Sequence, residues 1–297
     1  MNKKFLKKLT LHNIFIKWPK IFILEKIKEK TRNTFLRGLF FHKNPIIMTD
    51  KHGIRFVLYP WDKMSFEKLS THRMFDADFA GFKRLVKSGD IVFDIGANIG
   101  LHSTILSRII GKNGKLYSFE PVPNTFDLLN ETLALNKAYN AKSENIAFLD
   151  KIGKLSMNVF DINNSSLNSF GNPIFGKVKA IEKVDVEVDT IDNFCEKNKI
   201  LKIDFMKVDV EGFEKSVFLG AKKMLGNRLV DCLSFEISQI PLQGNNTKAK
   251  EIFDILLSYG YKSYKYNMST DKFEGPYFDS NDFYENYYAS YNDLTKV

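Results

Sequence analysis

The run from Val92 to Gly100, which reads VFDIGANIG, constrains the fold of this chain more than any other feature. Apolar residues lead into a turn with glycines at 96 and 100, and a helical pattern then continues to about residue 110. A buried strand that enters a helix through such a turn is typical of a parallel α/β sheet, and the helix N-terminus favours a bound ligand. We therefore expect an α/β fold with a ligand site at this turn.

The rest of the chain repeats the alternation of strand and helix. Further strands are predicted over 115–119, 184–188, 203–208, 232–235 and 261–266. Helices are predicted over 123–137, 190–197, 214–225 and 248–257, and short strands with polar breaks over 141–180. Such alternation at short intervals indicates a Rossmann-like, doubly wound and mostly parallel sheet covered by helices on both faces.

We expect four segments along the chain. Residues 1–43 form a basic amphipathic arm, and 44–90 form a lead-in with a β-hairpin around 45–58 and a helix over 76–87. The main domain is expected over 91–266. An ordered arm, acidic and rich in aromatic residues, is expected over 267–297, packed on the domain or on a partner.

The positive charge is confined to the first of these segments. The whole chain carries +9, but residues 1–43 hold 12 Lys and Arg against two acidic residues, a balance of +10, which leaves −1 for the remainder. A nucleic-acid-binding domain would carry its surplus on the folded core, so nucleic acid is not an expected partner. The arm has the pattern of short helices on a membrane surface, although a helical decoration without a membrane partner has the same pattern.

The small number of cysteines indicates a reducing compartment, and the short apolar runs argue against a membrane span or a secretory signal. Cys195 and Cys232 are too few for a disulfide framework and lack neighbours at metal-ligand spacing, so we expect buried thiols rather than nucleophiles. No run approaches the roughly 20 apolar residues of a membrane span, and lysines interrupt the region where a secretory signal would lie. The expected location is cytoplasmic, with a peripheral position at a membrane as a further option.

An acidic residue stands at the end of the strand that follows the glycine turn. Glu120 comes 20 residues after Gly100, in the sequence Phe119-Glu120-Pro121. A carboxylate at this place can accept both hydroxyls of a ribose. The glycine turn and Glu120 together predict an adenosine-type ligand; in the alternative interpretation both are structural.

The spacing of the turn favours S-adenosylmethionine over a dinucleotide. In a G-x-G-x-x-G pattern that starts at Gly96, the second and third glycine positions are Asn98 and Leu101, which obstruct a pyrophosphate. Asp94 would also repel phosphates, whereas it can hold a zwitterionic amino-acid group. A nicotinamide-dependent oxidoreductase is therefore the weaker interpretation.

A second polar cluster follows the strands over 203–208 and 232–235. Lys207, Asp209 and Glu211 are spaced by two and so share one face of a strand or of its extended exit. Glu236 ends the neighbouring strand in the same way. Because ligands bind at the carboxyl ends of parallel strands, we expect these side chains to converge on one crevice.

These motifs resemble those of the FkbM family of S-adenosylmethionine-dependent methyltransferases. The resemblance covers about residues 89–236 and rests on four sequences: FDIGANIG at 93–100, FEP at 119–121, VDTID at 188–192 and IDFMKVDVEG at 203–212. It implies a class I methyltransferase fold with a seven-stranded sheet and transfer of a methyl group, usually to an oxygen. It also implies that Asp94, Gly96, Asn98 and Gly100 line the methionine end of the cofactor and that Glu120 holds the ribose. The expected acceptor is a hydroxyl of a sugar, glycan or glycolipid.

Methyl transfer to a hydroxyl needs in-line positioning and loss of the hydroxyl proton. Asp209, Glu211 and Glu236 are the candidates for orienting and deprotonating the acceptor, with Lys207 pairing with them or setting their ionisation; a purely structural ion cluster is the alternative. Convergent carboxylates could also hold Mg²⁺, although the spacing does not demand a metal. A non-catalytic membrane-peripheral module that keeps the cofactor fold is the alternative function.

Three further candidates have weaker patterns. Asn145 is placed to meet the adenine amine. His102 lies in the first turn after the glycine loop, where it either reaches the crevice or packs between helices. The run over 165–167 is either a loop above the cofactor or a plain polar turn. The sequence makes no prediction of the oligomeric state.

Overall fold

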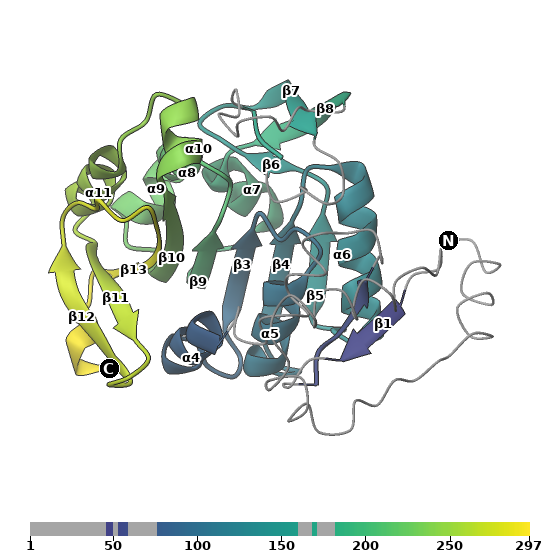
Figure 1. Cartoon of the computed structure of the whole chain (residues 1–297), viewed down its shortest axis with the longest axis horizontal. Coiled ribbons are helices and arrows are strands. Elements are labelled where there is room, and N and C mark those ends of the chain that lie inside the picture. The colour runs from purple at the N-terminus through teal and green to yellow at the C-terminus, as the bar shows by residue number, and fades with distance from the viewer. Residues whose placement is uncertain (1–45, 50–52, 59–75, 160–167, 171–181) are drawn as a thin grey trace, which may run out of the picture. The chain divides into compact units, whose positions relative to one another are not determined.

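The computed structural model places most of the chain after residue 75 (Figure 1). The residues described are 46–49, 53–58, 76–159, 168–170 and 182–297. The predicted basic arm over 1–43 and the loop over 165–167 lie outside them. The chain divides into two compact units, Met1–His72 and Arg73–Val297, which are described separately below.

The first unit contributes a β-hairpin. Strand β1 (Ile46–Thr49) pairs antiparallel with β2 (Arg55–Leu58), with Ile47 opposite Val57. The hairpin predicted from the turn composition between the two strands is confirmed.

The second unit is built on an eight-stranded sheet with the order β12-β11-β13-β10-β9-β3-β4-β5. Five neighbouring strands, β10, β9, β3, β4 and β5, run parallel, whereas β13 is antiparallel to both β10 and β11 and β12 is antiparallel to β11. The strand bounds are β3 (Ile91–Ile95), β4 (Lys115–Phe119), β5 (Ala141–Glu144), β9 (Ile203–Val208), β10 (Val230–Ser238), β11 (Lys262–Asn267), β12 (Lys272–Tyr277) and β13 (Tyr284–Ser290). The edge strand β12 makes the sheet one strand larger than the seven implied by the family resemblance.

Helices cover both faces of this sheet, as the doubly wound prediction requires. One face carries α4 (Asp76–Leu85), α5 (Leu101–Ile110) and α6 (Pro123–Leu135); the Phe82 ring of α4 packs edge-on against Phe205 of β9. The helices α7 (Ile191–Asn198), α8 (Glu214–Leu219), α9 (Lys222–Gly226) and α11 (Ala249–Ser258) bury their apolar side chains in one cluster with Phe93, Phe119 and Phe235 of the sheet. The fold is therefore α/β and Rossmann-like.

A small second sheet lies in the same unit. It has the order β6-β8-β7, with β6 (Ala147–Phe148), β7 (Gly153–Val159) and β8 (Glu182–Asp189). β7 and β8 form an antiparallel pair, with Leu155 opposite Val186. Short strands were predicted in this region, but not their separation into a sheet of their own.

The C-terminal segment corrects the predicted domain boundary. Residues 267–297 are not an arm on a finished domain, because β13 lies inside the sheet between β10 and β11. Its neighbouring side chains Tyr287 and Tyr288 point to opposite faces and are both buried, so they fill the two helix layers. The second unit accordingly extends to Val297, and it begins before β3 because α4 packs on the sheet.

The helix predicted over 214–225 is interrupted, and a short helix, α10 (Gln239–Gly244), was not predicted. Gly220 separates α8 from α9, because its backbone is pressed against the carbonyl of Leu149. A β-carbon at Gly220 would lie 2.0 Å from that oxygen, and the carbonyl of Gly220 itself accepts from the Asp192 N–H. None of the helices in the described part of the chain has the length and apolar character needed to cross a bilayer.

Candidate functional site

The predicted site residues gather at the carboxyl edge of the parallel strands. β3 ends in the glycine loop, β4 in Glu120, β9 in the turn from Asp209, and β10 carries Glu236 near its end. The pairing registers of β3 with β4 and β9 bring these strand ends side by side. The convergence expected from the sequence is therefore present in the fold.

The glycine loop is held by its backbone. The N–H groups of Gly96 and Ala97 both donate to the carbonyl oxygen of Phe119, at 3.0 and 2.9 Å. Gly96 has a φ of +78°, and a β-carbon there would lie 1.8 Å from the carbonyl oxygen of Asp209. A β-carbon on Gly100, at φ +87°, would lie 2.8 Å from Leu129. Within the described chain the glycines thus make room for protein atoms, whereas the sequence interpretation had given that room to a ligand.

Glu120 is buried directly beside the loop. Its Oε2 accepts from the Asn98 N–H at 3.1 Å and its Oε1 from the Val122 N–H at 3.0 Å. Burial raises the pKa of Glu120 to about 7, against the lowering effect of those two backbone donors. Asn145 donates to the carbonyl oxygens of Glu120 and Pro121, at 2.8 and 2.9 Å, and so fixes the chain at this point. Contacts of Glu120 with a ribose and of Asn145 with an adenine stay predictions.

A buried ion network joins the loop strand to the second polar cluster. Asp94 is fully buried and accepts from the Ser103 hydroxyl at 2.6 Å; its Oδ1 lies 3.7 Å from the Lys207 ammonium. The same ammonium donates to Asp209 Oδ2 at 2.9 Å. Burial alone would lower the pKa of Lys207, but the charges of Asp209 and Asp94 hold it above its ordinary value. Lys207 is therefore a buried cation between the two halves of the site.

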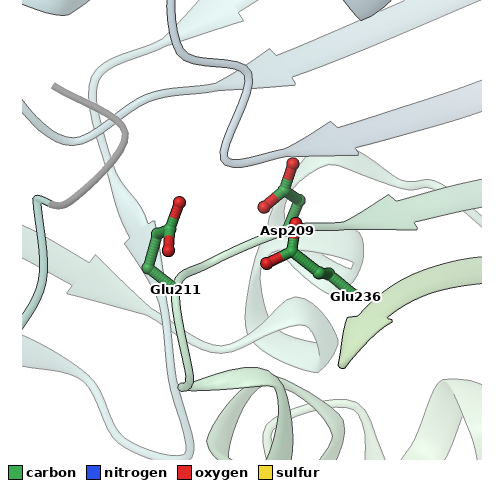
Figure 2. A group of neighbouring side chains, drawn as sticks. All are labelled: Asp209, Glu211 and Glu236. Carbon is green, nitrogen blue, oxygen red and sulfur yellow. The ribbon is translucent and has the colours of Figure 1, made fainter. Parts of the chain in front are cut away.

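Three carboxylates face one another beyond this lysine. Figure 2 shows Asp209 and Glu211 on the turn after β9 and Glu236 on the neighbouring strand, and one oxygen from each lies within 4.8 Å of the others. Burial, then the charges of Glu236 and Asp209, raise the pKa of Glu211 well above its ordinary value. Burial, then Asp209 and Glu214, do the same for the pKa of Glu236. A raised pKa makes an ionised carboxylate a stronger proton acceptor.

Glu214 is a fourth carboxylate of this crevice that the sequence reasoning missed. Its Oε1 accepts from the N–H groups of Val210 and Gly212, at 3.1 and 3.2 Å, and so holds the turn that carries Glu211. Its Oε2 is buried and has no hydrogen-bond partner among the described residues. Burial raises the pKa of Glu214 to about 7. The available signal was its position three residues after Glu211.

The carboxylates of Asp209, Glu211 and Glu236 could together hold a divalent cation. Carboxylate oxygens are the ligands that Mg²⁺ and Ca²⁺ prefer, and the three side chains can each offer one. Without a cation, the same oxygens can accept protons from the hydroxyl groups of a ligand. Both uses require the ligand to sit at the carboxyl edge of β9 and β10.

The remaining candidates have structural partners. His102 contacts α4: its Nε2 lies 3.0 Å from Asp78 Oδ2 and its ring packs edge-on against Phe82. Cys195 and Cys232 are buried, and burial raises the pKa of Cys195 to about 12. Neither thiol is thereby activated as a nucleophile.

The VDTID run of the family resemblance, residues 188–192, stabilises the starts of two helices. The hydroxyl of Thr190 accepts from the Asn193 N–H at the start of α7. The carboxylate of Asp192 accepts from the N–H groups of Lys223 and Met224 at the start of α9, at 2.8 and 3.0 Å. This motif therefore joins two helices on the far face of the sheet and is separate from the carboxylate crevice.

The family of the chain follows from a direct match. A family model described as the methyltransferase FkbM domain matches residues 94–263, more than half of the chain. The chain belongs to the FkbM methyltransferase family. The matched range begins at Asp94 and ends within β11, so it includes the glycine loop, Glu120 and the carboxylate crevice.

Two curated relatives are methyltransferases by name. Methyltransferase sdnD of Sordaria araneosa is 32% identical over 158 residues, which cover 45% of this chain and 61% of the relative. Hexuronic acid methyltransferase AglP of Haloferax volcanii is 27% identical over 144 residues, covering 46% of this chain and 52% of the relative. The chain thus spans between half and two thirds of the curated relatives it matches.

Solved structures with a similar course of the chain include further methyltransferases. An S-adenosylmethionine-dependent methyltransferase from Aquifex aeolicus matches with a TM-score of 0.40 and 15% identity, covering 77% of this chain and 98% of that one. An S-adenosylmethionine-dependent O-methyltransferase from Thermotoga maritima matches with a TM-score of 0.39 and 14% identity, covering 85% and 80%.

Proposed function

We propose that this protein transfers the methyl group of S-adenosylmethionine to a hydroxyl oxygen of a sugar, glycan or glycolipid. The observation that carries the proposal is that the Asp209, Glu211 and Glu236 carboxylates gather at the turn whose backbone touches the glycine loop at Gly96. Membership of a methyltransferase family supports the reaction class. The name of the relative AglP, a hexuronic acid methyltransferase, supports the choice of a carbohydrate acceptor.

In this proposal the cofactor lies across the ends of β3 and β4. The buried carboxylate of Glu120 is placed to accept from the ribose hydroxyls, and its bond to the Asn98 N–H ties it to the glycine loop. Gly96 and Gly100 shape the loop at the methionine end. Asp94 remains a candidate for the methionine end: its buried Oδ1 has no hydrogen-bond partner among the described residues and lies 3.7 Å from the Lys207 ammonium.

The acceptor lies over the carboxylate crevice. Its hydroxyl oxygen forms a bond to the methyl carbon as the carbon–sulfur bond breaks, and the bonding electron pair remains on the sulfur of the S-adenosylhomocysteine product. The hydroxyl proton passes to one of the crevice carboxylates in its ionised form, and a raised pKa makes Glu211 or Glu236 a stronger base in that form. Lys207 orients Asp209 through their 2.9 Å hydrogen bond. Correct alignment of the two substrates supplies much of the rate.

The crevice could hold Mg²⁺ as well, and no step above passes through a cation. If a bound Mg²⁺ polarised the acceptor hydroxyl, transfer would stop in EDTA and return with added Mg²⁺. Transfer that persists in EDTA leaves proton acceptance to the carboxylates alone.

Calorimetric titration tests the cofactor assignment. The full chain is titrated with S-adenosylhomocysteine and, separately, with NAD. Binding of the first and not of the second is the expected result, and folded protein that binds only NAD would instead support an oxidoreductase. Mass spectrometry of glycans from cells with and without the protein then identifies the acceptor. A chain that binds the cofactor while no cellular glycan gains a methyl group would contradict the carbohydrate assignment.

A further inference from the structure

Tyr284 joins the carboxylate crevice from the strand that the sequence had assigned to an arm. It is the first residue of β13 and lies opposite Ser238 of β10, two residues beyond Glu236. Ser238 and Glu236 are two residues apart on β10, so their side chains lie on the same face of the sheet. Tyr284, which is paired with Ser238, lies on that face too, and Glu236 itself is paired with Asn286. Tyr284 and Glu236 lie close enough that each shifts the pKa of the other. The strand register thus places the tyrosine at the rim of the crevice.

The side chain of Tyr284 is largely exposed, although it stands beside the buried Glu236. Tyr284 is 59% exposed, whereas Glu236 is 7% exposed; desolvation and the charge of Glu236 raise the pKa of Tyr284. Tyr287 and Tyr288, on the same strand, are only 1% and 2% exposed. Of these three tyrosines, only the one at the crevice leaves a flat apolar surface uncovered.

A flat apolar ring beside carboxylate oxygens is complementary to a sugar ring. A pyranose presents C–H groups on its faces, which pack on an aromatic ring, and hydroxyl groups at its edge, which donate to carboxylates. Building on the proposed methyl transfer, we propose that Tyr284 is an acceptor-binding residue: a sugar ring stacks on its exposed face and directs a hydroxyl toward Glu236 and Glu211.

The position of the Tyr284 ring fits the geometry of methyl transfer. Glu236 lies near Tyr284, and one of its oxygens lies within 4.8 Å of an oxygen each of Asp209 and Glu211. Asp209 in turn touches the glycine loop at Gly96. An acceptor ring on Tyr284 therefore reaches toward the cofactor loop across the carboxylates that are proposed to take its proton.

Saturation-transfer difference NMR tests the stacking directly. The full chain is mixed with S-adenosylhomocysteine and methyl β-D-glucopyranoside or methyl β-D-galactopyranoside, and aromatic protein protons are irradiated. Uncharged glycosides are used so that charge–charge interactions with the crevice do not contribute to the signal. Saturation of the C–H protons on one glycoside face is expected for at least one probe. Tyr284→Leu should abolish it, whereas Tyr139→Leu should not, since Tyr139 is an 88% exposed tyrosine that precedes β5, at the opposite edge of the sheet.

Kinetics separate binding from folding. Tyr284→Leu should raise the KM for the glycoside that accepts the methyl group at least tenfold. It should leave the dissociation constant of S-adenosylhomocysteine within twofold of the wild type. Tyr284→Phe keeps the ring, so its KM should stay within threefold of the wild type, while loss of the hydroxyl near Glu236 should shift the pH profile of turnover.

Two results would overturn the inference without touching the proposed reaction. One is a Tyr284→Leu protein that saturates and methylates the glycoside as the wild type does. The other is a wild-type protein that binds S-adenosylhomocysteine and methylates a hydroxyl that is not on a sugar, with no saturation of either glycoside. Absence of S-adenosylhomocysteine binding would instead remove the proposed function itself.

Discussion

The α-carbon of Gly96 faces the carbonyl oxygen of Asp209 so closely that a β-carbon would lie 1.8 Å from it. The glycine loop after β3 and the carboxylate turn after β9 therefore touch through their backbones. In our account the first holds the cofactor and the second serves the acceptor. The spacing between the two substrates is set at this contact.

Replacing Gly96 by alanine should disturb both halves of the site. Gly96→Ala introduces a side chain at φ +78° and drives the Asp209 turn away, so we expect a loss of about 3 kcal/mol or more in the free energy of unfolding. Gly89→Ala is the matched control: its φ is +97°, but no atom lies within 4 Å of the added carbon, and about 1 kcal/mol should be lost. Urea denaturation measures both. Equal losses in the free energy of unfolding for the two variants would show that the contact between Gly96 and Asp209 does not contribute to stability.

Removing the buried cation should be far more damaging than removing a surface one. Lys207→Met leaves Asp94 and Asp209 without their cation in a buried setting, and we expect a loss of about 3–5 kcal/mol. The control is Lys202→Met, because Lys202 pairs with Asp204 and Asp231 but is 49% exposed, and such pairs contribute about 1 kcal/mol or less. If urea denaturation gave similar losses for both variants, Lys207 would not hold the network together.

Cofactor affinity should rise with pH. The pKa of Glu120 is raised to about 7, and only its ionised form offers acceptors to both ribose hydroxyls. Between pH 6 and pH 8 the ionised fraction grows about tenfold, so the affinity for S-adenosylhomocysteine should grow by about that factor. Calorimetry at the two pH values measures this. Glu120→Ala should bind weakly at both; a wild-type affinity independent of pH would contradict the assignment of Glu120 to the ribose.

Several strands could be predicted from the sequence almost residue by residue. β4 and β9 are apolar runs bounded by turns, and their predicted limits agree with the structure. β13 could not be predicted, because its partners β10 and β11 are set by tertiary pairing and its polar residues obscure the alternation. The break at Gly220 likewise depends on the Leu149 carbonyl, which is distant in the sequence.

The site residues also divide into those that could be predicted from the sequence and those that depend on tertiary structure. Convergence of Lys207, Asp209 and Glu236 was predictable, since the carboxyl ends of parallel strands meet at one edge. The contribution of Tyr284 was not, since it depends on where β13 enters the sheet. Glu214 was missed because its burial under the turn of Val210 and Gly212 has no sequence pattern of its own.

Glu214 should make the protein less stable as pH rises. Its pKa is about 7 in the folded protein against an ordinary 4.5, so between these values the folded state binds more protons than the unfolded state and stability falls with increasing pH. Glu214→Gln removes this titration, and we expect the wild type to lose about 2 kcal/mol more than the variant between pH 5 and pH 8. Urea denaturation at both pH values is the measurement, with the surface change Glu187→Gln as control. Parallel pH dependence in wild type and Glu214→Gln would contradict this assignment.

Our central claim is that different residues at the carboxyl edge of the sheet serve the acceptor and the cofactor. Asp209→Asn tests this claim most directly. Two quantities are measured on the same protein: the rate of tritium transfer from methyl-labelled S-adenosylmethionine to the acceptor glycan, and the dissociation constant of S-adenosylhomocysteine. We predict that transfer falls about 100-fold or more, since the carboxylate serves the acceptor proton, while the dissociation constant stays within about threefold. Unchanged transfer, or cofactor affinity that falls as far as transfer does, would contradict the account.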